Sequence, residues 1–421
     1  MNKTILKNGL TLLTQVKEET QTSSIVVSVK AGAKHEPHET AGISHFVEHM
    51  VFKGTKNIPD PTRLSAVIEN VGGFVNASTD YDSTNYWVKI PHTHTSKGLA
   101  LLFDMLSNSL FENVSVETER KVIVEEINSV NDFPDTKCEL NLQRIMWPGT
   151  YLEKDIAGSR ETVASITRSD LVNFSNRNHN PSKIIVSVAG NIDATSVTSL
   201  VSDLSVELPC FEEQNNATNQ DIEAKNGQIH IEKIDTEQMF VSLGYPGASA
   251  NDETKYACYL INLILGSGMS SLLFKEVREK RGLAYDIESR QYNLDDCGYF
   301  TISAGLSKDR FEESIKLIDA VASKCYDTID ENELSRAKSM YQGRLILGME
   351  DSLSIAEFNA ASQLFTSNGC DVGEHLEKIN KVSLPKIKEV AKSYLTEPCL
   401  LYTSDAADEG LGVDLGGRRI I

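Results

Sequence analysis

The chain has few cysteines, no long apolar run and a shortage of basic residues. Its seven cysteines are scattered over 421 residues without a C-x-x-C pair, which argues against a disulfide framework or a zinc knuckle. No apolar run reaches the length of about 18 residues that a membrane-spanning helix requires. Residues 1–15 lack the apolar core and the cleavage site of a signal peptide. We therefore expect free thiols, no membrane span and a cytoplasmic location.

Negative charge dominates the composition. The 60 acidic residues outnumber the 41 basic residues, and the net charge is −19. A nucleic acid requires a basic face on its partner, so the composition argues against nucleic-acid binding. An acidic surface attracts cations and basic peptides instead. The hydrophobic content of 40% is that of an ordinary globular protein, and the length fits two domains of about 200 residues each.

The sequence also indicates where the two domains meet. Residues 208–227 are polar, acidic and poor in hydrophobic residues, which predicts a linker between a domain at 1–207 and a domain at 228–401. Residues 238–249 repeat the pattern of residues 24–33: an apolar strand and a small-residue turn, followed by a helix. Duplication of an ancestral domain is the simplest account of this repeat.

The stretch at residues 42–51 (GISHFVEHMV), for which we predict a helix, carries the main chemical signal. His45 and His49 stand four residues apart and share one helix face, from which Glu48 also projects. The other positions are apolar or small, which predicts a buried helix, where these polar groups are costly unless compensated. A zinc ion would compensate them, and the order His-x-x-Glu-His is a zinc-hydrolase signature. The alternative is two core histidines beside a chance glutamate.

A second helix, predicted for residues 116–130, adds two carboxylates. Glu119 and Glu126 are seven residues apart and lie at the edge of its apolar stripe. The alternative to a cation site is a solvated acidic face. If the metal site exists, Glu126 is the natural third ligand, and the fourth position remains for water. Glu119 would then orient a ligand or support proton transfers.

These motifs together resemble the pitrilysin family of inverted zincins, and in particular its short, two-domain, processing-peptidase-like members. The matching strings are GISHFVEHMVFKGT, ERKVIVEE and EVREK followed by RGLAY, with 76 residues between His49 and Glu126. The resemblance covers residues 1 to about 400. It implies an α+β fold of two similar domains, each a mainly antiparallel sheet with helices packed on it. It also implies zinc as the cofactor, with His45, His49 and Glu126 as ligands, Glu48 as general base and Glu119 as supporting acid.

The resemblance further implies how a peptide substrate is held. Asn76 and Ala77 fall on the family's edge strand, which pairs with the substrate backbone. Arg278 and Tyr285 match an Arg/Tyr pair that binds substrate and helps to stabilise the tetrahedral intermediate, and that a partner subunit generally offers in short members. The chain departs from the family pattern at residues 402–421, which are rich in glycine and aspartate. We expect this segment to be a disordered tail that need not be native to the protein.

Three functions are compatible with parts of this pattern. The first is a zinc metalloendopeptidase for short or unfolded peptides, acting as a homodimer because one chain carries both the zinc motif and the Arg/Tyr pair; a heterodimer with a related subunit is the variant. The second is a non-catalytic peptide-binding or scaffold subunit of a processing peptidase complex, although such relatives typically lack part of the zinc motif. The third is the small lyase that cleaves S-ribosylhomocysteine, whose single short domain and cysteine ligand do not fit this chain.

Overall fold

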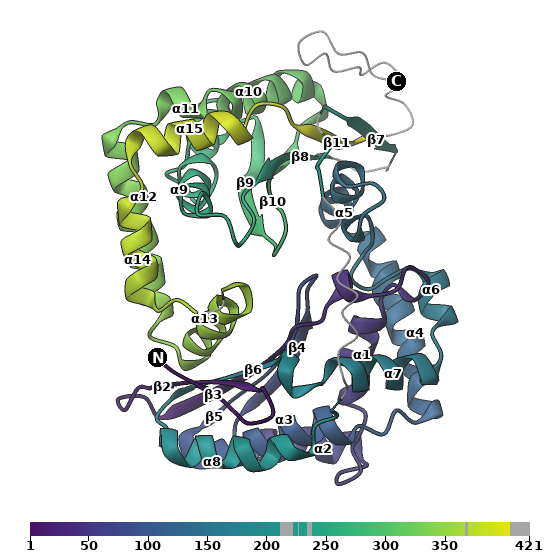
Figure 1. The fold of residues 1–421 in the computed structure, drawn as a ribbon. Helices are drawn as coiled ribbons and strands as arrows, with labels where there is room; N and C mark the ends of the chain where they lie inside the picture. The colour runs from purple at the N-terminus through teal and green to yellow at the C-terminus, as the bar shows by residue number, and fades with distance from the viewer. Residues whose placement is uncertain (211–221, 226, 234–237, 367–368, 405–421) are drawn as a thin grey trace. The chain divides into compact units, whose positions relative to one another are not determined.

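The computed structural model describes the whole chain except residues 211–221, 226, 234–237, 367–368 and 405–421. The described residues form two compact units, and neither unit is continuous in sequence (Figure 1). Unit 1 comprises Met1–Asn128, Lys154–Asn219 and Leu345–Val372. Unit 2 comprises Ser129–Glu153, Gln220–Arg344 and Gly373–Ile421. Each half of the sequence therefore contributes one segment to the unit built mainly from the other half.

A six-stranded sheet forms the centre of unit 1. Its order is β1 (Asn2–Ile5), β2 (Thr11–Val16), β6 (Ile184–Gly190), β3 (Thr22–Val29), β5 (Thr84–Pro91) and β4 (Phe74–Thr79). Only β2 and β6 pair in parallel, and every other pair is antiparallel. The central strands β3 and β6 are buried on both faces, as their runs of β-branched residues predict. Strand β4 lies at the edge of the sheet.

Helices cover both faces of this sheet. Val27 faces a core formed with α1 (Ile43–Val51), α2 (Pro61–Glu69), α3 (Thr95–Asn108) and α8 (Ala194–Leu204). Helices α4 (Asn113–Ser129), α6 (Arg160–Ser165) and α7 (Arg168–Asn178) complete this side. Val26, the next residue along β3, faces the opposite way and packs against Ile355 and Ala356 of α13 (Ser352–Phe365). The period of two along β3 thus divides its side chains between two cores.

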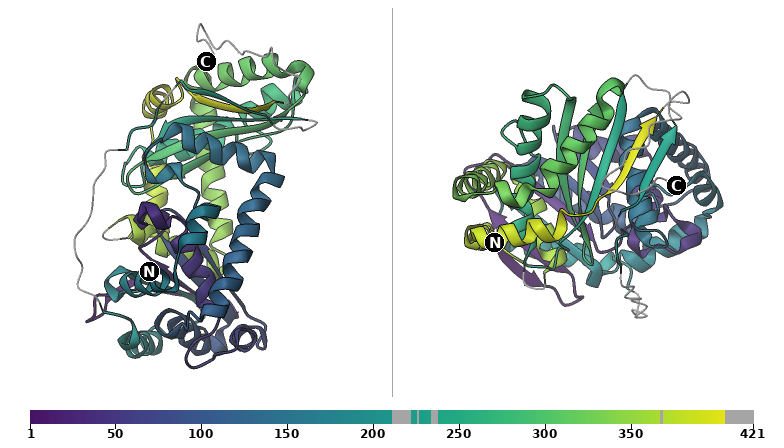
Figure 2. Two further views of the ribbon diagram at one scale, coloured as in Figure 1. Left: turned by 90° about the vertical axis from the view of Figure 1, so that its right-hand side faces the viewer. Right: turned by 90° about the horizontal axis from the view of Figure 1, so that it is seen from above.

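A five-stranded sheet forms the centre of unit 2. Its order is β7 (Ile229–Lys233), β11 (Cys399–Ser404), β8 (Met239–Gly247), β10 (Gly298–Leu306) and β9 (Ala284–Asn293). Figure 2 shows β11, in yellow, between its two neighbours. Only β7 and β11 are parallel, so the order and directions repeat those of β2-β6-β3-β5-β4. This correspondence confirms the predicted α+β fold of two similar, mainly antiparallel halves.

The helices of unit 2 include the counterpart of α1. This helix, α9 (Lys255–Leu265), follows β8 as α1 follows β3 and lies almost entirely in the core. A short π-helical turn (Phe274–Glu279) leads into β9. The other helices are α5 (Pro134–Met146), which packs on β8 and β11, α10 (Phe311–Ser323), α11 (Cys325–Thr328), α12 (Glu331–Gly348), α14 (Val372–Lys381) and α15 (Leu384–Tyr394).

Two predictions for irregular segments have different outcomes. Most of the predicted linker 208–227 lies outside the described residues, as do residues 405–421 of the predicted tail. Strand β11, however, continues to Ser404, so the prediction that the tail begins at residue 402 was wrong. Backbone pairing of residues 402–404 with β7 extends the strand past the point where the apolar pattern stops. Within the described part of the chain, no helix combines the length and the apolar character needed to cross a bilayer.

Candidate metal centre

Helix α1 begins at a tight turn that a buried carboxylate caps. Gly42 has φ +94°, and a Cβ there would lie 2.5 Å from the carbonyl oxygen of Ala157, so this position requires glycine. The Glu36 carboxylate accepts the backbone N–H groups of Gly42 at 2.7 Å and Ser44 at 2.8 Å, which lack partners within the helix. Burial raises the pKa of Glu36 to about 7. Gly42 and Glu36 thus hold the backbone at the start of α1, immediately ahead of His45.

The burial pattern of α1 leaves its polar face as its least buried side. Phe46, Val47, Met50 and Val51 are buried in the core of unit 1. His45, Glu48 and His49 are only half-buried, and they are the side chains that the sequence placed on one helix face. The packing of the apolar residues therefore determines where these three polar groups point.

His45, His49 and Glu126 converge in unit 1. One potential ligand atom from each lies within 4.8 Å of the others. The two imidazole Nε2 atoms are 3.3 Å apart, and the Glu126 carboxylate oxygens lie 3.8 Å from Nε2 of His45 and 3.6 Å from Nε2 of His49. Tetrahedral zinc with Zn–N bonds of about 2.0–2.1 Å holds two nitrogen ligands about 3.3 Å apart. The donor set and its spacing therefore fit zinc.

Glu119 contacts the outer side of one of these imidazoles. Its Oε2 lies 3.2 Å from Nδ1 of His49, and its Oε1 lies 2.8 Å from Nζ of Lys53. The other imidazole differs, because Nδ1 of His45 is buried and has no hydrogen-bond partner among the described residues. Burial, and then the neighbouring His49, lower the pKa of His45 to about 4. At neutral pH His45 is therefore uncharged, as a metal-binding imidazole must be.

Glu48 stands beside the converging ligands and has its own partner. The hydroxyl of Thr79, the last residue of β4, donates a hydrogen bond to Oε2 of Glu48. Burial raises the pKa of Glu48, while the Thr79 hydrogen bond acts in the opposite direction. A carboxylate with a raised pKa is a better proton acceptor than an exposed one. The arrangement can therefore support general-base chemistry next to a metal.

Three of the four remaining predicted residues lie on edge strands, and the fourth, Arg278, lies in the π-helical turn before β9. Asn76 and Ala77 belong to β4, at the edge of the sheet of unit 1, and Asn76 is exposed. Arg278 and Tyr285 belong to unit 2, where the Arg278 guanidinium lies over the rings of Phe274 at 4.8 Å and Tyr285 at 5.7 Å. Tyr285 is 76% exposed and stands near the start of β9, the counterpart of β4. The substrate-binding roles of these residues stay predictions.

Sequence reasoning missed three residues that contact α1 or the carboxylates beside the three donors. Lys53 follows His49 by four residues, the helical spacing that also relates the two histidines, so its position carried a usable signal. The positions of Glu36 and Thr79 in the sequence carried no such signal. Glu36 reaches α1 from a loop, and the contact of Thr79 with Glu48 depends on how β4 packs beside α1.

Two family models match successive parts of the chain. Residues 11–160 match the insulinase family, peptidase family M16, and residues 165–341 match the M16 inactive domain. The chain belongs to the M16 peptidase family. The first match contains His45, Glu48, His49, Glu119 and Glu126, and the second contains Arg278 and Tyr285.

Individual M16 relatives and structures agree with this assignment. An uncharacterized zinc protease of Bacillus subtilis is 30% identical over 396 residues, which cover 93% of this chain and 95% of the relative. An uncharacterized zinc protease of Rickettsia felis is 33% identical over 346 residues, covering 82% and 83%. The crystal structure of a protease from Helicobacter pylori has a TM-score of 0.88 over 96% of this chain and 99% of that chain. At 22% identity, this last likeness shows the shared fold.

Proposed function

We propose that the protein is a zinc-dependent endopeptidase that hydrolyses short or unfolded peptides. The observation that carries this proposal is the convergence of His45, His49 and Glu126, with Glu48 on the same helix as the two histidines. A non-catalytic subunit would have no use for a complete set of three donors and a base. The names of the M16 relatives, zinc protease, support the same activity.

Each residue of the centre has a role that its surroundings explain. His45, His49 and Glu126 would hold the zinc ion, which when bound would lower the pKa of a water molecule and polarise the scissile carbonyl. Glu48 accepts the proton of the attacking water and returns it to the leaving amine. Thr79 fixes one oxygen of Glu48, so that the other remains available for this transfer. Glu119 accepts a hydrogen bond from the Nδ1–H group of His49 and so supports the orientation of this ring.

We infer that the substrate backbone pairs with the free edge of β4. Asn76 and Ala77 lie on this edge, and Thr79 of the same strand contacts Glu48. An extended peptide added to a sheet edge gains main-chain hydrogen bonds with little demand on its sequence. Folded proteins offer few such extended segments, which favours short or unfolded substrates. The net charge of −19 favours basic ones.

The proposal extends to the quaternary arrangement. We infer a homodimer in which Arg278 and Tyr285 of one subunit act at the zinc centre of the other. A mixing experiment tests this: the variants Glu48→Gln and Arg278→Ala are each inactive, and mixed dimers regain activity because one site combines an intact base with an intact pair. If mixing restores no activity, the pair acts within its own chain.

The seven free cysteines fit the cytoplasmic location that we propose.

The catalytic proposal is tested with a variant that keeps the shape of the base. Glu48→Gln removes its basicity, so peptide hydrolysis should fall by roughly 10²–10⁴-fold while the zinc content stays at one ion per chain. The matched control is Glu125→Gln, because Glu125 is exposed on α4 and should leave hydrolysis unchanged. The proposal would be disproved if Glu48→Gln hydrolysed peptides at the rate of the unaltered protein. It would also be disproved if the protein hydrolysed peptides after its metal had been removed.

A further inference from the structure

We propose that Lys53 is a positioning residue of the metal centre. It holds the Glu119 carboxylate in place, and Glu119 in turn fixes the orientation and the tautomer of His49. The inference rests on the proposed zinc function and deepens it, because it assigns a role to a residue outside the donor set. Lys53 pairs with Glu119, which lies beside the three donors.

The local backbone keeps Lys53 beside α1. Its N–H donates to the Met50 carbonyl at 3.0 Å, a bond between residues three apart that closes the end of α1. The next residue, Gly54, then turns the chain away with φ +107°, and a Cβ there would lie 2.3 Å from the carbonyl oxygen of Pro59. A residue with a side chain could not make this turn without displacing the backbone. The ammonium group of Lys53 is thus presented on the side of α1 where Glu119 lies.

Glu119 is a buried carboxylate with both oxygens engaged. Its side chain is 7% exposed, Oε1 pairs with Nζ of Lys53 at 2.8 Å, and Oε2 lies 3.2 Å from Nδ1 of His49. An ionised carboxylate only accepts hydrogen bonds, so Nδ1 of His49 must carry the ring proton. Its Nε2 then keeps a free lone pair, and Nε2 is the atom that faces His45 and Glu126. The chain Lys53–Glu119–His49 therefore prepares one ligand for the metal.

The centre depends on this chain because the other histidine has no equivalent support. Nδ1 of His45 is buried without a hydrogen-bond partner among the described residues, so hydrogen bonding orients only the His49 ring. If Lys53 is removed, Glu119 keeps its burial but loses the cation that holds Oε1. Its carboxylate is then free to rotate away from His49. Loss of a partner on the outer ring nitrogen typically costs about 10–100-fold in metal affinity.

A simple charge effect predicts the opposite sign. A lysine near a dication repels it, so an effect through charge alone would make Lys53→Met bind zinc more tightly. The positioning role predicts weaker binding. The direction of the change therefore separates the two explanations.

The test measures zinc affinity of the full chain, stripped of metal, by competition with a chromophoric chelator. Lys53→Met should weaken zinc binding about 10–100-fold. Lys53→Arg, which retains a cation, should restore most of the affinity. Lys56→Met is the matched control, because Lys56 is exposed and lies three residues after Lys53. This variant should bind zinc as tightly as the unaltered protein does. Circular dichroism of the metal-free proteins verifies that each variant is folded.

A double-mutant cycle then locates the effect. In a Glu119→Gln background, Lys53→Met should change the zinc affinity little further, because the residue through which it acts is already altered. This double variant also removes both charges of the pair, so it stays informative if Lys53→Met alone fails to fold. The inference would be overturned if Lys53→Met bound zinc as tightly as the unaltered protein or more tightly. It would also be overturned if Lys53→Met lowered the zinc affinity equally in the unaltered and the Glu119→Gln backgrounds. Failure of the unaltered protein to bind zinc would instead refute the proposed function.

Discussion

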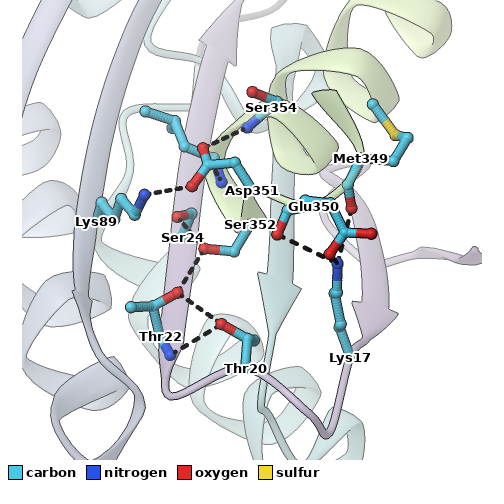
Figure 3. A network of polar contacts seen from close by, with 11 residues as sticks. Lys17, Thr20, Thr22, Ser24, Lys89, Met349, Glu350, Asp351, Ser352 and Ser354 are labelled. Atoms are coloured by element: carbon cyan, nitrogen blue, oxygen red, sulfur yellow. Dashed lines mark hydrogen bonds and ion pairs between the residues drawn. The ribbon is translucent and has the colours of Figure 1, made fainter. Parts of the chain in front are cut away.

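Ser24 and Ser352 lie 328 positions apart in the sequence, yet their hydroxyl oxygens are 2.9 Å apart in a buried contact. Figure 3 shows the network around them at the N-terminus of α13. Lys89 of β5 pairs with Asp351, the residue that caps α13, and Lys17 pairs with Glu350 at 3.3 Å. The unit that carries the candidate metal centre is therefore closed by a helix from the second half of the sequence.

We predict that α13 is needed for the stability of unit 1. Ile355→Ala should lower the free energy of unfolding by about 2–5 kcal/mol, because Ile355 is 2% exposed and packs against Val26 and Ile185. Urea denaturation measures this loss, and hydrogen exchange should show it as weaker protection of β3 and β6. Ala361→Ser, at an exposed position of the same helix, serves as the control. Full protection of β3 in a chain that ends before residue 345 would contradict the prediction.

A second prediction concerns the hydrogen bond between Thr79 and Glu48. Thr79→Val keeps the shape of the side chain but removes the donor, so Glu48 loses the contact that orients it. We expect kcat for peptide hydrolysis to fall by about 10-fold or more, with KM little changed, since substrate pairing with β4 is retained. Thr79→Ser keeps the hydroxyl and should stay close to the unaltered rate. A change confined to KM would mean that Thr79 acts on substrate binding instead.

Metal binding should also appear as thermal stability. Zinc at about 1,000 times its dissociation constant adds about 4 kcal/mol to the stability of the folded state. For a unit of this size, this gain should raise the melting temperature by about 10 °C. His49→Ala should lose the gain, whereas His38→Ala, altered at an exposed residue of a short 3-10 helix, should keep it. Equal zinc-dependent shifts in both variants would place the bound metal elsewhere.

A fourth prediction concerns acid sensitivity and the buried His179. Complete burial lowers the pKa of this imidazole from 6.5 to about 4, although Nδ1 donates to the Leu106 carbonyl at 3.0 Å. Between these values the unfolded chain binds a proton that the folded chain does not. The contribution of His179 to stability is therefore complete above pH 6.5 and is lost as the pH falls toward 4.

The variant His179→Asn removes this titration and keeps a donor for the Leu106 carbonyl. Between pH 7 and pH 5, the unaltered protein should lose about 2 kcal/mol more unfolding free energy than the variant. Urea denaturation at both values measures the difference, and contributions from the other histidines cancel because both proteins share them. Equal losses would show that His179 is protonated in the folded state.

The sequence by itself determined the local chemistry and the class of fold. The spacing of His45, Glu48 and His49 on one helix face follows from 3.6 residues per turn, and the position of Glu119 and Glu126 at the edge of an apolar stripe follows from the same period. These are short-range properties, which is why they could be read without coordinates. The repeated strand, turn and helix pattern likewise predicted the two similar halves that the sheet orders confirm.

Tertiary structure alone decided the long-range contacts. Seventy-six residues separate Glu126 from His49 in the sequence. Only the packing of α4 beside α1 brings Oε2 of Glu126 to 3.6 Å from Nε2 of His49. The contact of Thr79 with Glu48 and the closure of unit 1 by α13 arise in the same way. Helical and strand periods specify which face a residue takes, but they contain no information on which distant element will cover that face.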